Sequence, residues 1–171
     1  MRHLILVDAA IGLVENPAPV KSGGVVAGLF GIRPLRTALI ATVGTQPLFS
    51  EFWLRKFVAR KEVVTPSRTA IYREPFVLDG FTASLGDWAV QFAGESGKSL
   101  SERPEGFRKL PIPLTLVWGQ EDTITPLPQA QVLQRLAAGS RLLVLPGVGH
   151  IPQIEDPALF NARMTEILQH P

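Results

Sequence analysis

The sequence predicts an α/β protein, with a small parallel sheet, flanking helices and a helical insertion. Continuous apolar runs at Leu4–Val7, Leu114–Trp118 and Leu142–Leu145 have the length of strands. Runs that do not alternate with polar residues are typical of parallel strands covered on both faces. A helical pattern follows each of the last two runs, and strand, helix, strand, helix is the unit of a doubly wound sheet.

The first predicted strand, Leu4–Val7, directly follows Met1-Arg2-His3. Its apolar run is too short for a signal peptide or a membrane span. The longest other apolar stretch, Val25 to Ile32, is also too short and contains two glycines. We therefore expect a cytoplasmic protein that does not interact with a membrane.

Residues 15–105 are predicted to form a helical cap or lid insertion with its linkers, between core segments 1–14 and 106–171. Gly and Pro punctuate this stretch, and no strand-like alternation is evident. The polar segment Gly94–Gly106 is the predicted exit linker. Four helical pieces are expected: Pro34–Val43, Pro47–Ala59, Pro66–Arg73 and Phe81–Phe92.

The clearest helix is the one between the last two strands. Thr125-Pro126 offers an N-cap followed by proline at the first helical position, and Gly139 offers a left-handed stop. A further helix is expected from Asp156-Pro157. Both carry apolar stripes at helical spacing, formed by Val132, Leu133, Leu136 and Ala137 in the first and by Phe160, Met164, Ile167 and Leu168 in the second.

Composition excludes several classes of function. The 171 residues suffice for one domain, and 46% apolar residues are ample for its core. The absence of cysteine excludes disulfides, thiolate chemistry and cysteine-ligated metals, and the three histidines are far apart, so no metal and no cofactor are expected. A net charge of +2 does not imply a nucleic-acid partner.

Asp122 and His150 are the residues most able to carry chemistry. Each follows a predicted strand, and catalytic groups gather beyond the carboxyl ends of parallel strands. The separation of 28 positions between them holds one right-handed crossover. If the two strands are neighbours, about 4.8 Å apart, the loops can bring the carboxylate within reach of the imidazole. Taken singly, Asp122 fits a turn or helix-cap residue and His150 a histidine near a turn.

Two segments of the sequence resemble the acid and base signatures of α/β-hydrolases. They are residues 116–126, LVWGQEDTITP, and residues 146–160, PGVGHIPQIEDPALF. Residues 4–10, LILVDAA, are similar to the strand that follows the nucleophile helix of this family. The resemblance implies that Asp122 is the triad acid and His150 the base, in the order the family uses after its nucleophile. Asp8 remains a minor alternative for the acid, because some members carry it after that strand.

No nucleophile accompanies these two residues. The family elbow is G-x-S-x-G on a strand-to-helix turn. The segment around Ser84, TASLG, lacks the leading glycine, and the segment around Ser96, GESGK, lacks the closing one. We therefore expect the C-terminal portion of a longer hydrolase, or a natural half-protein that needs a partner, inactive alone. An active enzyme that uses Ser84, and a non-catalytic binding or complementing subunit, are the alternatives.

The resemblance also sets the expected substrate. The parent enzyme would hydrolyse an ester-type or related bond in a small apolar or ester-like substrate. The single tyrosine, Tyr72, argues against epoxide hydrolases, which use a pair of cap tyrosines; esterase, dehalogenase, perhydrolase and carbon–carbon hydrolase remain open. A sheet of about three strands leaves an exposed edge, which would favour self-association.

Overall fold

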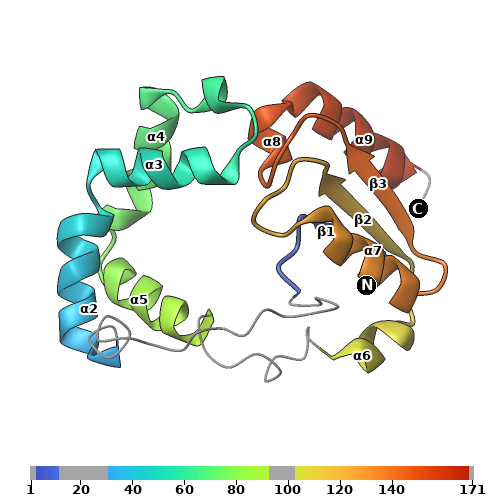
Figure 1. Cartoon of the computed structure of the whole chain (residues 1–171), viewed down its shortest axis with the longest axis horizontal. Helices are drawn as coiled ribbons and strands as arrows, with labels where there is room; N and C mark the ends of the chain where they lie inside the picture. Colours follow the sequence, from blue (N-terminus) through green and yellow to red (C-terminus); the bar gives the residue numbers. More distant parts are fainter. Residues whose placement is uncertain (1–2, 12–30, 93–102, 170–171) are drawn as a thin grey trace. The chain divides into compact units, whose positions relative to one another are not determined.

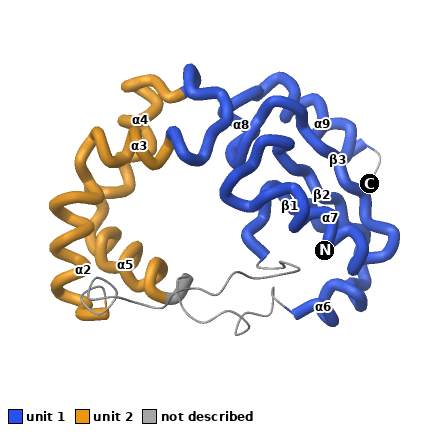
Figure 2. Tube along the Cα trace, viewed as in Figure 1, with its two compact units in different colours: residues 1–16, 55–63, 96–171 blue, residues 17–54, 64–95 orange. Residues whose placement is uncertain are grey.

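The computed structural model describes residues 3–11, 31–92 and 103–169 (Figure 1). Contacts divide the chain into two compact units (Figure 2). The first, here called the sheet unit, comprises Met1–Asn16, Arg55–Val63 and Ser96–Pro171, and the second, the helical unit, comprises Pro17–Leu54 and Val64–Glu95. The sequence analysis assigns residues 55–63 to the insertion, but their contacts place them in the sheet unit.

The sheet has three parallel strands, in the order β1-β2-β3. They are β1 (Leu4–Val7), β2 (Leu114–Gly119) and β3 (Arg141–Leu145). Every residue of β2 is buried, as its unbroken apolar run predicts. The predicted α/β fold class, with a parallel sheet of about three strands, is confirmed.

Helices of the sheet unit cover both faces of its sheet (Figure 1). Because side chains alternate along a strand, Leu116 and Trp118 of β2 share one face and Val117 lies on the other. The first face packs against Leu133 of α7 (Leu127–Leu136), and the second against Ile167 of α9 (Pro157–Gln169). Two short helices, α6 (Pro104–Arg108) and α8 (Pro152–Glu155), complete this unit.

The helical unit is built from short helices, as its Pro and Gly spacing predicts. It contains α2 (Arg33–Leu39) with a following π-helix (Ile40–Gly44), α4 (Pro66–Arg73) with a following 3₁₀-helix (Glu74–Val77), and α5 (Phe81–Phe92). Helix α3 (Pro47–Phe57) begins in this unit and ends in the sheet unit, where a 3₁₀ turn (Lys61–Val63) follows it. Within the helical unit, buried Arg36 of α2 pairs with Asp87 of α5.

Two local predictions are wrong. The predicted linker Gly94–Gly106 does not continue to its end, because α6 begins at Pro104 with proline in its first turn; residues 93–102 lie outside the described residues. Thr125 is not the N-cap of α7, because Pro126 takes that position without a capping side chain. The predicted stop at Gly139 does adopt a positive φ of 85°.

Among the residues that the structure describes, none of the helices combines the length and apolar character that crossing a membrane requires.

Candidate active site

The loops that follow β2 and β3 meet at one edge of the sheet. The N–H of Gln120 donates to the carbonyl of Leu145 at 2.9 Å, and the N–H of Glu121 donates to that of Val148 at 3.0 Å. At Gly119 an added Cβ would lie 2.1 Å from the carbonyl oxygen of Gly149. Only glycine allows the two main chains to approach this closely, and the approach places Asp122 beside the loop of His150.

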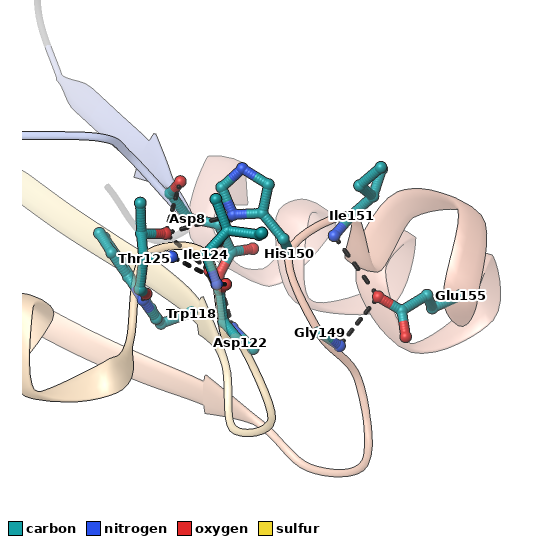
Figure 3. A network of polar contacts seen from close by, with 10 residues as sticks. Asp8, Trp118, Asp122, Ile124, Thr125, Gly149, His150, Ile151 and Glu155 are labelled. Carbon is teal, nitrogen blue, oxygen red and sulfur yellow. Dashed lines mark hydrogen bonds and ion pairs between the residues drawn. The ribbon is translucent and has the colours of Figure 1, made fainter. Parts of the chain in front are cut away.

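Asp122 and His150 are hydrogen-bonded. Nδ1 of His150 lies 2.9 Å from Oδ2 of Asp122. The Asp122 side chain has no exposed surface, and that of His150 is 19% exposed. Figure 3 shows the second ring nitrogen of His150 directed away from Asp122. The geometry therefore leaves one imidazole nitrogen available to a third group.

Three further donors hold the Asp122 carboxylate. Oδ1 accepts from the N–H groups of Ile124 at 2.7 Å and Thr125 at 2.9 Å, and Oδ2 accepts from the Thr125 hydroxyl at 2.7 Å. Burial acts to raise the pKa of Asp122, but the hydrogen bonds from His150, Thr125 and Ile124 together lower the pKa below its ordinary value. Asp122 is therefore held as a carboxylate.

Thr125 belongs to the site, which the sequence analysis missed. Its hydroxyl lies 2.7 Å from Oδ2 of Asp122 and 3.2 Å from Nδ1 of His150. Its carbonyl accepts from Nε1 of Trp118 at 2.6 Å, a contact that anchors the turn on β2. A threonine before a proline is typical of a helix N-cap. The sequence therefore gave no indication that the Thr125 hydroxyl would bind the Asp122 carboxylate.

Asp8, the alternative acid, lies at the end of β1 and makes no hydrogen bond with His150 in the described part of the chain (Figure 3). Its Oδ1 accepts from the N–H of Gly119 at 2.7 Å, while its Oδ2 is buried and has no hydrogen-bond partner among the described residues. Asp8 is 4% exposed and has a positive φ of 41°. Burial raises its pKa from 3.8 to about 8, opposed by the hydrogen bond from Gly119 and reinforced by the charge of Asp122.

His150 also contacts the last residue of α3. Its N–H donates to the carbonyl of Phe57 at 2.9 Å, and the two rings lie 5.4 Å apart between centroids. This contact joins residues 93 positions apart, and no local pattern signals it.

The two serines considered as nucleophiles do not form an elbow in the described residues. Ser84 is an exposed residue in the interior of α5, whereas an elbow is a strand-to-helix turn. Ser96 lies outside the described residues. Among the residues that the structure describes, no group of three or more His, Asp or Glu side chains is placed to hold a metal ion.

Comparison with known proteins decides the family. The model of the "Alpha/beta hydrolase family" matches residues 2–163. The chain belongs to the α/β-hydrolase family. An uncharacterized protein of Mycobacterium tuberculosis is 37% identical over 49 residues, which are 29% of this chain and 14% of that protein.

Solved structures share the hydrolase fold. A meta-cleavage product hydrolase from Pseudomonas fluorescens has a TM-score of 0.64 at 23% identity, over 77% of this chain and 49% of that one. A thermophilic esterase from Thermogutta terrifontis has a TM-score of 0.65 at 18% identity, over 98% of this chain and 55% of that one. The chain thus spans about half the length of these hydrolases.

Proposed function

We propose that this α/β-hydrolase chain supplies the acid, Asp122, and the base, His150, of a nucleophile–His–Asp triad for the hydrolysis of an ester-type or related bond. The observation that carries the proposal is the 2.9 Å contact between Oδ2 of Asp122 and Nδ1 of His150. It joins a buried carboxylate to an imidazole at the carboxyl ends of adjacent parallel strands.

The chemistry follows from the hydrogen bond. A carboxylate can only accept, so Nδ1 carries the proton and the lone pair lies on Nε2. His150 would take a proton from a hydroxyl nucleophile, or from water, at Nε2. The imidazolium formed would then be stabilised by the negative charge of Asp122, which its low pKa maintains. Asp122 orients the base and does not itself accept the proton.

The nucleophile would come from outside these 171 residues. None of the serines lies in a G-x-S-x-G segment, and aspartate or cysteine elbows are also absent from the sequence. The match to about half the length of two solved hydrolases supports the same view. The chain alone is therefore expected to be inactive.

The proposed substrate is small and apolar or ester-like. Exposed aromatic side chains gather on α3 of the helical unit, among them Phe49, Phe52 and Trp53. Contiguous exposed apolar patches mark binding sites, and substrate pockets are lined mostly by apolar and aromatic side chains. Their place in an insertion supports a cap that contacts substrate.

A second candidate is a non-catalytic, complementing subunit of hydrolase descent. Strand β1 pairs with β2 alone in the described residues, so its outer edge is open. An open edge is a docking surface for another strand. On this proposal the edge pairs with a partner chain or with a second copy.

Hydrolysis of p-nitrophenyl acetate tests the first proposal. The 171-residue chain should hydrolyse this ester no faster than its His150→Ala variant. Turnover by the chain that disappears in Ser84→Ala would overturn the proposal, because it would place the nucleophile in α5.

A fusion supplies the positive arm of the test. An N-terminal segment with a G-x-S-x-G elbow, taken from a full-length α/β-hydrolase, is joined before Leu4. Hydrolysis by the fusion should fall about a thousandfold or more in His150→Ala and in Asp122→Ala. A folded, active fusion that tolerates both substitutions would contradict the proposed roles.

A further inference from the structure

Glu155 is a buried carboxylate that the proposed chemistry does not use. It is the last residue of α8, five positions after His150, and it is 4% exposed. Among the described residues, four main-chain N–H groups lie within hydrogen-bond distance of its two oxygens. An isolated buried charge is costly, so a carboxylate at this place has to be compensated by its donors.

The four donors come from two separate segments. Oε1 accepts from Gly149 at 2.8 Å and from Ile151 at 3.4 Å, the two residues that flank His150 (Figure 3). Oε2 accepts from Ala59 at 2.7 Å and from Arg60 at 3.0 Å, in the segment that follows α3. Only a group that accepts at both oxygens satisfies all four, and an ionised carboxylate is such a group.

Other contacts hold the same two segments together. The N–H of His150 donates to Phe57, and Nε of Arg60 donates to the carbonyl of Gly147 at 3.0 Å. At Gly149 an added Cβ would lie 2.8 Å from the nitrogen of Ala59, so the main chains touch where glycine permits it. Glu155 accepts hydrogen bonds from main-chain N–H groups of both segments.

We infer that Glu155 is a positioning residue, whose carboxylate fixes the loop of His150 against residues 57–60 and thereby holds the imidazole in reach of Asp122. The inference rests on the proposed function of His150. Phe57 is the last residue of α3, so the same carboxylate fixes the chain that leaves this helix beside the base.

Glu155→Gln tests the inference, with Glu166→Gln as the matched control. Gln keeps the shape but replaces one acceptor oxygen by an NH₂ donor, which faces N–H groups. Glu166 makes its ion pairs with Arg141 and Arg163 at the surface. Amide hydrogen exchange at Gly149, Ile151, Ala59 and Arg60 should accelerate roughly ten- to hundredfold in Glu155→Gln, from the loss of charge-assisted hydrogen bonds.

The tautomer of His150 separates positioning from a purely structural role. In Glu155→Gln, ¹⁵N NMR should show His150 as a mixture of Nδ1–H and Nε2–H forms, while exchange in β2 stays as in the unaltered chain. A Glu155→Gln spectrum and exchange pattern equal to those of Glu166→Gln would overturn the inference. An unaltered chain without the Nδ1–H form would instead contradict the proposed function, so the two failures are distinguishable.

If Glu155→Gln does not fold, a measurement on the unaltered chain tests the inference instead. The amides of Gly149 and Ala59 should exchange at least tenfold more slowly than that of Gly139, which lies in an exposed turn. Exchange as fast as at Gly139 would show that Glu155 does not hold these groups, and would overturn the inference.

Discussion

Replacing Asp8 by Asn should remove most of the pH dependence of stability above pH 5. The Asp8 carboxyl is buried, and its Oδ2 has no hydrogen-bond partner in the part of the chain that the structure describes. Burial, opposed by the hydrogen bond from Gly119 and reinforced by Asp122, raises its pKa from 3.8 to about 8. Asn keeps an acceptor for the N–H of Gly119 and resembles the protonated carboxyl in shape, but it does not titrate.

The magnitude follows from proton linkage. Between pH 3.8 and about 8 the folded chain binds a proton at Asp8 that the unfolded chain has lost. The free energy of unfolding therefore falls as pH rises through this window, by up to about 1.4 kcal/mol per pH unit. From pH 5 to pH 8 the loss is on the order of 3 kcal/mol, and Asp8→Asn should be more stable than the unaltered chain at pH 8 by a similar amount.

Urea unfolding followed by tryptophan fluorescence measures this effect, because Trp118 is fully buried beside the site. The unaltered chain, Asp8→Asn and the control Asp79→Asn, at an exposed position, are compared from pH 5 to pH 8.5. Asp122 does not interfere, because its lowered pKa confines its own titration to more acidic pH. An Asp8→Asn variant with the same slope as the unaltered chain would refute the reasoning.

Three other substitutions probe the same edge of the sheet. Because the pKa of Asp122 is lowered in the folded chain, its carboxylate stabilises the fold above pH 3.8, and this stabilisation is lost as pH falls through the folded-state pKa. Asp122→Asn should therefore reduce the loss of unfolding free energy at acidic pH. An unchanged loss would count against the hydrogen bonds described. Gly119→Ala should lower the free energy of unfolding in urea by about 3 kcal/mol or more, because its Cβ would lie 2.1 Å from the carbonyl oxygen of Gly149. The control Gly106→Ala has open space around the added Cβ and should be tolerated. Equal effects of the two substitutions would be inconsistent with the packing. Thr125→Val should lower the free energy of unfolding by about 1–3 kcal/mol, and Thr125→Ser by much less, because only Ser keeps the hydroxyl that donates to Asp122. A Val variant as stable as the Ser variant would argue against this hydrogen bond.

The sequence predicted the elements that depend on local patterns. The continuous apolar runs of β2 and β3, with one crossover helix between them, were enough to expect parallel neighbours. Since the ends of such strands meet at one edge, the same reasoning anticipated that Asp122 and His150 approach each other, and the structure places them 2.9 Å apart. Their catalytic role remains a proposal.

The residues around this pair could not be predicted from such patterns. Thr125 looks like a helix cap because its neighbour is proline, yet its hydroxyl turns toward Asp122. Glu155 binds N–H groups 95 and 96 positions away, and main-chain donors leave no signature in the sequence. Asp8 reads as a turn residue, and only burial reveals its raised pKa. Each of these roles depends on tertiary contacts rather than on periodicity.

The state of the His150 ring tests the central claim most directly. The chain has three histidines, so ¹⁵N NMR can assign each by single substitution to Gln. His3 is already bound at Nε2 to the Thr115 hydroxyl at 3.0 Å and serves as an internal comparison. At a pH where the ring is neutral, His150 should be the Nδ1–H tautomer with an unprotonated Nε2, and Asp122→Ala should abolish this preference. A His150 ring that is Nε2–H, or that averages between tautomers with or without Asp122, would contradict the assignment of acid and base.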